Sequence, residues 1–277
     1  MLHDATPRDG TAVSQRRGRA PSWKNPRTVL ITGATGGIGA ALALHYASAG
    51  RTLILHGRDG ARLASLCAQC EARGARALDV AFDVRETATV VEELRRLSQQ
   101  EAIDLAIVNA GVTRMMQDGD QVESVEIARE VLDVNLHGAL ATVAGVLPQM
   151  RRRGTGQIAL MSSLAAYVGV PKTPVYCASK AALRAYGEAL RSWLEPQGIA
   201  VNVVLPGFIQ TDMTAQVSGP KPFLMPADRA ARTIRRGLER NRARIAFPRS
   251  FAWGAMWLSI LPAPLSMQIL KALGFGR

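Results

Sequence analysis

The chain has 277 residues, 48% of them hydrophobic, and a formal net charge of +12. It is long enough for one sizeable folded domain, and no repeat of solenoid spacing or collagen-like tract is present, so those architectures are excluded. Three cysteines give no disulfide framework, and Cys67 and Cys70 lack a second Cys or His pair, so no metal or redox site is predicted. The expected location is a reducing cytoplasm.

The excess positive charge lies at the two ends of the chain. Residues 1–27 carry a net +4, residues 28–225 carry no net charge, and residues 226–277 carry +8. The first 26 residues are rich in Arg, Pro, Gly and polar side chains, which predicts a disordered segment. They lack the apolar stretch of a secretory signal, and Asp4 and Asp9 disfavour a transit peptide.

The first predicted element is a strand that leads into a glycine-rich turn and a helix. The short apolar and β-branched run Thr28–Thr32 is followed by Gly33, Gly37 and Gly39, and then by a helical segment over residues 40–47. Glycines let such a turn tighten and let a pyrophosphate approach the backbone at the helix N-terminus. Glycine-rich turns occur in many α/β proteins, but the strand and helix on either side favour dinucleotide binding here.

The same alternation continues through the first half of the chain. Strands are predicted over residues 51–56, 75–82 and 104–109, and helices over residues 60–73 and 88–98. This order is typical of βαβ units, so we predict an α/β fold with a Rossmann-type doubly wound parallel sheet in three α/β/α layers. In such a sheet the ligand lies beyond the carboxyl ends of the strands, where Gly33, Arg58, Asp83 and Asn109 fall.

Tyr176 and Lys180 stand four residues apart in a predicted helix. At this spacing both side chains project from one face, so the ammonium group can lie near the phenol and stabilise its anion. A tyrosine placed in this way can exchange a proton near neutral pH. The alternative is an amphipathic helix with one aromatic side chain and one solvated lysine.

The motifs together resemble the short-chain dehydrogenase/reductase family in its single-domain form. In the family's order they are Thr32-Gly33-x-x-x-Gly37-x-Gly39, Asp83, Asn109-Ala110-Gly111, Asn135, Ser163, Tyr176-x-x-x-Lys180 and Pro206-Gly207. Each motif is weak by itself, but the ordered set spans the chain from about Thr28 to about Met213. The resemblance implies hydride transfer between a nicotinamide and a carbon that bears an alcohol or a carbonyl.

The resemblance assigns four residues to catalysis. Tyr176 would be the general acid or base, Lys180 would lower the phenol pKa and hydrogen-bond the nicotinamide ribose, and Ser163 would hydrogen-bond the substrate oxygen. Ser162 is adjacent, but neighbouring strand residues face opposite sides, and the family spacing favours Ser163. Asn135 would hold a water that links Lys180 to solvent; alternatively, it is a buried asparagine that satisfies the backbone of a bent helix.

The resemblance also predicts which residues border the cofactor. Asp83 would accept a hydrogen bond from the adenine amine, or else cap the following helix, and Thr211 would lie near the nicotinamide carboxamide. The full predicted set is Gly33, Thr35, Gly36, Gly37, Ile38, Gly39, Arg58, Asp83, Val84, Asn109, Ala110, Gly111, Tyr176, Lys180, Pro206, Gly207, Ile209 and Thr211.

The end of the second strand bears on the choice of cofactor. NAD enzymes usually place an acid there to bind the ribose diol, whereas a neutral residue followed by Arg suits a 2′-phosphate. Gly57 stands in that position and Arg58 follows it, which favours NADP(H). Asp59, and Gly36 where many NADP enzymes have a basic residue, keep NAD(H) as the alternative, and Arg58 could also be a surface residue stacked on adenine.

Residues 227–277 are predicted to be a C-terminal extension of a catalytic domain over residues 27–226. Residues 227–248 are expected to contain a basic helical stretch, and residues 251–270 contain no charge but include Trp253 and Trp257. The apolar segment could pack on its own subunit or at an oligomer interface, or lie at an anionic membrane surface. A transmembrane span is the third interpretation, although Pro262 and Pro264 would break a simple spanning helix.

These observations predict an NADP(H)-dependent oxidoreductase that acts on a carbonyl or secondary alcohol of an apolar or lipid-linked substrate. A dehydratase or epimerase of the same fold is disfavoured by the glycine spacing and by the lack of a larger substrate domain. The alternative from another class is a catalytically silent dinucleotide-binding scaffold or regulator. A homodimer or homotetramer is expected from the resemblance, and nucleic-acid binding is not expected because no reader motif accompanies the basic ends.

Overall fold

The computed structural model describes residues 22–116 and 122–274 of the chain. Seven parallel strands form the main sheet, in the spatial order β3-β2-β1-β4-β5-β6-β9. Their bounds are β1 Thr28–Ile31, β2 Thr52–His56, β3 Arg76–Val80, β4 Leu105–Val108, β5 Gly156–Met161, β6 Ile199–Pro206 and β9 Arg244–Phe247. The predicted doubly wound parallel sheet is confirmed, and the strand order reverses between β1 and β4, where such folds bind their ligand.

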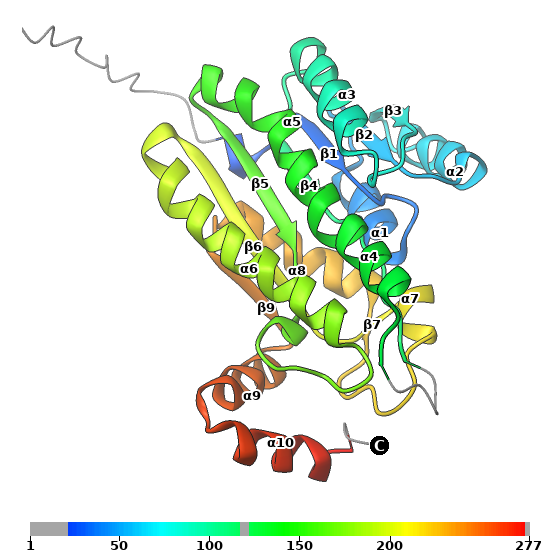
Figure 1. Ribbon diagram of the computed structural model, residues 1–277. Coiled ribbons are helices and arrows are strands. Elements are labelled where there is room, and N and C mark those ends of the chain that lie inside the picture. The colour runs from blue at the N-terminus through cyan, green and yellow to red at the C-terminus, as the bar shows by residue number, and fades with distance from the viewer. Residues whose placement is uncertain (1–21, 117–121, 275–277) are drawn as a thin grey trace, which may run out of the picture.

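Helices cover both faces of this sheet (Figure 1). One face carries α1 (Gly37–Tyr46), α2 (Gly60–Glu71) and α8 (Ala227–Glu239), and the other carries α3 (Thr87–Gln100), α5 (Gly138–Arg153) and α6 (Pro174–Leu194). Successive side chains of a strand point to opposite faces of the sheet and so contribute to the hydrophobic core on each face. In β1, Val29 and Ile31 face the first helix layer while Leu30 faces the second. The three-layer arrangement follows from this pattern.

Shorter elements connect the layers at the carboxyl edge of the sheet. They are α4 (Val125–Leu132), the π-helical turn η2 (Asp133–His137), the 3-10 turn η3 (Leu164–Ala166) and α7 (Asp212–Ala215). The 3-10 turn η4 (Glu195–Gln197) lies at the opposite edge, just before β6. Strand β7 (Ile209–Gln210) pairs with β8 (Met225–Pro226). This pairing holds the two ends of the segment over residues 208–226 together, so the segment forms a loop.

The sheet extends past the predicted domain end at residue 226. Within the stretch expected to be helical over residues 227–248, only α8 is a helix, and β9 is the edge strand of the main sheet. Residues 244–247 alternate between exposed or half-buried and buried positions, the pattern of a strand with one face in the core. The C-terminal extension proper therefore begins after β9.

Two helices follow β9, namely α9 (Arg249–Ile260) and α10 (Ala263–Ala272), separated at Leu261 and Pro262. They lie together at one end of the molecule (Figure 1). The break excludes one continuous spanning helix over residues 251–270, as Pro262 and Pro264 suggest. In the described part of the chain, the helical run over residues 125–153 is the one long and apolar enough to cross a membrane, and 56% of its apolar window is buried inside the fold.

Residues 1–21 of the predicted disordered segment lie outside the described residues. Its last residues include the 3-10 turn η1 (Ser22–Lys24), which contacts α8 and β5. The expected disorder therefore does not extend through residue 26.

Candidate active site

The turn after β1 is held by the residues that follow β4. Asn109 Nδ2 donates to Thr32 O at 3.1 Å and to Gly33 O at 3.0 Å. Thr32 Oγ1 accepts from the backbone N–H groups of Asn109 at 3.0 Å and Ala110 at 3.1 Å. Gly33 has a φ of +63°, and a Cβ at Gly39 would lie 2.3 Å from Gly33 O. Both positions therefore require glycine.

The N-terminus of α1 emerges from this turn. Gly36 precedes its first residue, Gly37, and within the described part of the chain no side chain caps this end of the helix. Ile38 packs against the core below. The uncapped positive end of the helix dipole, reached through glycines, fits a pyrophosphate.

His56 links the turn to the loop after β3, a role that the sequence did not reveal. Its buried ring accepts from Gly33 N–H through Nδ1 at 3.3 Å and donates from Nε2 to Phe82 O at 2.8 Å. The ring stacks on Phe82 with centroids 4.1 Å apart. Burial lowers the pKa of His56, so the neutral tautomer that satisfies both bonds is favoured. In the sequence, only the position of His56 at the carboxyl end of a predicted strand could have indicated this role.

The end of β2 is shaped by Thr35. A Cβ at Gly57 would lie 2.8 Å from Thr35 Cγ2, so an acid at this position would require Thr35 to move. Arg58 is exposed beside it. Asp59 caps α2, because its carboxylate accepts from Arg62 N–H at 3.0 Å. Asp59 is thus engaged in a structural role.

Asp83 and Val84 follow β3. The backbone N–H of Arg85 donates to Asp83 Oδ1 at 3.0 Å, and its Nη2 donates to Oδ2 at 2.5 Å. These hydrogen bonds lower the pKa of Asp83 to about 2. The residue that precedes α3 is Glu86, so Asp83 does not cap this helix. An ionised carboxylate still has acceptor sites for an amine. Val84 is buried.

The two serines after β5 have different surroundings. Ser162 Oγ is buried and donates to Lys180 O at 2.7 Å. Ser163 Oγ accepts from Ala165 N–H at 3.2 Å and lines a pocket together with Tyr176. The nearby Ser163 hydroxyl acts to lower the pKa of Tyr176. The structure therefore brings Ser163, and not Ser162, to Tyr176.

Burial dominates the protonation of Tyr176 and Lys180. Lys180 Nζ donates to Met161 O at 2.9 Å and lies 5.7 Å from the centroid of the Tyr176 ring. Burial lowers the pKa of Lys180 to about 8. Burial raises the pKa of Tyr176, more than the hydrogen bond from Ser163 lowers it. Desolvation of the phenol thus outweighs the stabilisation of its anion by Ser163. The lowering of the phenol pKa by Lys180 stays a prediction.

Asn135 and Gly111 complete this cluster. Asn135 Oδ1 accepts from Val112 N–H at 2.7 Å, and its Nδ2 donates to Val112 O at 2.9 Å. A Cβ on Gly111 would lie 3.2 Å from Asn135 Oδ1 and 3.3 Å from Lys180 Nζ. Asn135 lies in the π-helical turn η2, but the backbone groups that it bonds belong to Val112 in the loop after β4 and not to its own helix. Its predicted role in holding a water stays a prediction.

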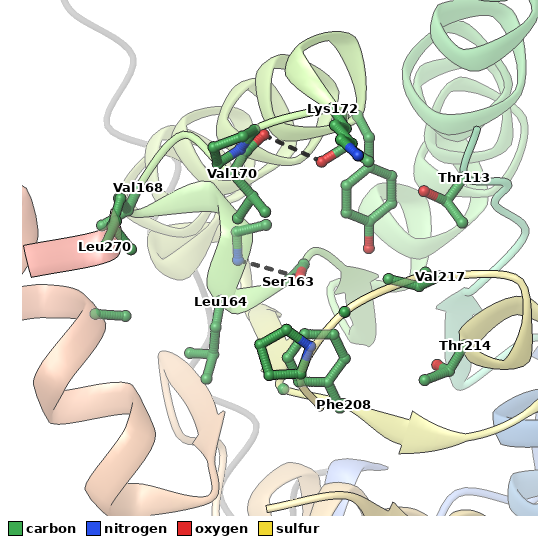
Figure 2. A pocket seen from close by; sticks show the side chains of 18 of the residues that line it. Thr113, Ser163, Leu164, Val168, Val170, Lys172, Phe208, Thr214, Val217 and Leu270 are labelled. Carbon is green, nitrogen blue, oxygen red and sulfur yellow. Dashed lines mark hydrogen bonds between the residues drawn. The ribbon is translucent and has the colours of Figure 1, made fainter. Parts of the chain in front are cut away.

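Ser163 and Tyr176 open into a cavity of about 470 Å³. Figure 2 shows Val168 and Leu270 on one side of it and Thr113 and Val217 on the other, with Ser163 between them. Most of its walls are aliphatic or aromatic, and Lys172 is the only charged side chain among the described residues that line it. Both α9 and α10 contribute side chains to the wall of the cavity. Packing of this segment on its own subunit was one of the three interpretations of the sequence.

Pro206 and Gly207 lie between the site and the C-terminal helices. The backbone N–H of Gly207 donates to Phe247 O at 2.8 Å, and a Cβ there would lie 3.2 Å from Phe251 Cδ1. Ile209, the first residue of β7, is buried in the core. This packing fixes the start of the loop that borders the pocket.

Thr211 lies where the loop after β6 contacts the glycine turn after β1. It caps α7 by accepting from Thr214 N–H at 3.3 Å. A Cβ at Gly37 would lie 2.5 Å from Thr211 Cγ2, so the loop contacts the start of α1. In the described ranges, no three His, Cys, Asp or Glu side chains are grouped to hold a metal.

Comparison with known proteins agrees with this geometry. A family model described as short chain dehydrogenase matches residues 27–221. An uncharacterized oxidoreductase of Myxococcus xanthus is 34% identical over 244 residues, which cover 86% of this chain and 94% of that protein. Ketoacyl reductase HetN of Nostoc is 36% identical over 70% of this chain and 69% of its own length.

A solved short-chain dehydrogenase from Sphingobium yanoikuyae, in complex with NADPH, superposes with a TM-score of 0.72. It is 27% identical to this chain, and the match covers 88% of this chain and 95% of that one. The ordered motifs, the sheet and these matches lead to one conclusion: the chain belongs to the short-chain dehydrogenase/reductase family and is an oxidoreductase.

Proposed function

We propose that this chain is an NADP(H)-dependent oxidoreductase that interconverts a carbonyl and a secondary alcohol on an apolar substrate. The observation that carries the proposal is that Ser163 and Tyr176 line the same apolar cavity, next to the cluster of Lys180, Asn135 and Gly111. A carbonyl oxygen placed between the serine and tyrosine hydroxyls would receive two hydrogen bonds in a largely apolar surrounding.

The bound nicotinamide would supply the hydride for reduction or accept it in oxidation. During reduction the phenol of Tyr176 donates its proton to the oxygen that becomes the alcohol, and Ser163 Oγ stabilises the developing negative charge. The raised pKa of Tyr176 keeps the phenol protonated, which is the form that reduction needs. The nearby ammonium of Lys180 would stabilise the phenolate that this proton transfer leaves.

Three observations support NADP(H) over NAD(H). Gly57 cannot become an acid unless Thr35 moves, Asp59 is engaged as the cap of α2, and Arg58 is exposed where a 2′-phosphate would lie. Arginine suits a phosphate because its guanidinium can form two parallel charge-assisted hydrogen bonds. The S. yanoikuyae relative, by its description, binds NADPH.

The test is NADPH oxidation in the presence of aliphatic ketones and aldehydes of increasing chain length. We expect kcat/KM to rise with chain length, because longer chains bury more apolar surface in the cavity. Tyr176→Phe should lower kcat by about 10²- to 10⁴-fold, the usual contribution of general acid catalysis, while NADPH affinity is retained. Tight NADPH binding without turnover of any carbonyl or alcohol would favour the scaffold alternative instead.

A further inference from the structure

The outer side of the C-terminal helices is strongly apolar and exposed. Six side chains, which we call the C-terminal apolar face, are between 45% and 72% exposed: Trp253, Trp257, Ile260, Leu265, Met267 and Leu273. On α9, Trp253, Trp257 and Ile260 follow a spacing of four and three residues, so they form one stripe. The opposite side of α9 is packed, since Ala252 and Ala255 are buried. A helix that is apolar on both sides ordinarily has both sides covered.

The C-terminal apolar face adjoins the mouth of the cavity. Leu273 belongs to the face and also lines the cavity, as do Leu258 and Leu270 from the inner sides of the two helices. The segment over residues 208–226, whose Phe208, Met213 and Val217 line the cavity, also exposes Phe223 and Leu224, at 60% and 46%. Phe223 approaches Phe251 of α9 with ring centroids 6.1 Å apart. Exposed apolar side chains thus come from two elements that line the cavity, the C-terminal helices and the segment over residues 208–226.

Charge distinguishes the occupants that could cover this face. Residues 249–277, the stretch that includes both helices, contain two Arg and one Lys but no Asp or Glu. Arg249 begins α9 and Lys271 is in the last turn of α10, and both are exposed. A two-fold contact between copies would set this positive surface against itself, whereas an anionic lipid surface complements it. Tryptophan also suits the headgroup region of a bilayer.

We propose that the C-terminal apolar face docks on an anionic membrane surface and that the cavity receives an amphiphilic carbonyl or alcohol directly from the lipid. The docking claim depends on the face alone, while the entry of substrate depends on the proposed function. The helices lie in the interface and do not span it, since α9 and α10 are short and separated by a proline-containing break.

Vesicle flotation of the full chain tests the docking. Wild-type protein should float with vesicles of phosphatidylcholine mixed with phosphatidylglycerol and should float far less with phosphatidylcholine alone or at high salt. The double variant Trp253→Ser/Trp257→Ser should lower the partition coefficient by at least about ten-fold. Arg249→Gln should lower it by about five-fold. The matched control is Trp193→Ser, because Trp193 is 56% exposed but lies in the last turns of α6.

Two results would overturn the docking. One is a folded, NADPH-binding wild-type chain that does not float with anionic vesicles. The other is a double tryptophan variant that floats unchanged but dissociates into smaller species in light scattering, which would assign the face to a second copy. NADPH titration of every variant separates both results from misfolding.

Kinetics test the substrate route separately. Anionic vesicles should raise kcat/KM for a long-chain ketone and leave it unchanged for a short water-soluble one, and the double tryptophan variant should lose only the long-chain effect. Vesicle binding without any turnover would contradict the proposed function and leave docking intact. Turnover that vesicles never enhance would contradict the entry of substrate from lipid.

Discussion

The glycine turn after β1 and the α9–α10 segment serve the same site but are built in opposite ways. The turn is held by hydrogen bonds between residues distant in sequence, such as Asn109 Nδ2 to Gly33 O at 3.0 Å, and by glycines that have no room for a Cβ. The α9–α10 segment is held by side-chain packing on one side and exposes large apolar groups on the other. The turn therefore tolerates few substitutions, whereas the walls of the pocket can vary and set substrate preference.

The largest expected effect separates the two neighbouring serines. Ser163→Ala should lower kcat by about 10²- to 10³-fold, because it removes a donor to the reacting oxygen. Ser162→Ala should instead lower the free energy of unfolding by about 1 kcal/mol, since its hydroxyl only bonds Lys180 O. Steady-state kinetics with urea unfolding of both variants checks this. Equal loss of kcat in both would contradict the placement of Ser163.

Gly39→Ala should disrupt the glycine turn after β1, on which the expected binding of the cofactor depends. Its Cβ would lie 2.3 Å from Gly33 O, so we expect NADPH affinity to fall by at least about ten-fold and the free energy of unfolding by about 1–3 kcal/mol. Gly60→Ala is the control, because nothing lies within 4 Å of its Cβ position at the start of α2. Calorimetric titration and urea unfolding measure both effects. A tolerated Gly39→Ala would show that the turn is less constrained than its contacts indicate.

Substitutions in α9, which forms part of the cavity wall, should alter substrate binding and not cofactor binding. Leu258→Ala enlarges the cavity and should raise KM for a long-chain ketone by about ten-fold while NADPH affinity is unchanged. Leu265→Ala, on α10 but outside the cavity lining, should leave KM in detergent-free buffer unaltered. An effect of Leu258→Ala on NADPH affinity alone would contradict the division between the two regions.

The smallest effect concerns pH and His56. Burial lowers its pKa from the ordinary value of 6.5, so the folded state binds fewer protons and the contribution of His56 to stability is complete above that value. It is lost as the pH falls from 6.5 through the lower folded pKa. The difference in unfolding free energy between wild type and His56→Gln should therefore shrink in that range. Urea unfolding at several pH values measures it, and a difference that grows with acidity would contradict the neutral tautomer.

Site residues could be predicted best from the sequence where the backbone conformation admits only a few residue types. Gly33, Gly39 and Asn109 could be placed because a tight turn with a close helix admits few residue types. It did not reveal His56, whose partners come from two other segments. The raised pKa of Tyr176 could not be foreseen either, because burial depends on the whole pocket.

The C-terminal end was the least predictable from local pattern. Arginines at 240, 242 and 244 suggested a continuing helix, but residues 244–247 pair with β6, which is a long-range contact. Likewise, no local pattern shows that α9 and α10 close the cavity, because their apolar residues serve both the pocket wall and the exposed face.

The most direct test of the central claim is calorimetric titration of the wild type and Arg58→Ala with NADPH and with NADH. Wild type should prefer NADPH, and Arg58→Ala should weaken NADPH binding by about 10- to 100-fold through loss of charge-assisted hydrogen bonds while NADH binding stays unchanged. Arg96→Ala, an exposed arginine on α3, should alter neither. Equal affinity for the two cofactors, unaffected by Arg58→Ala, would contradict the central claim.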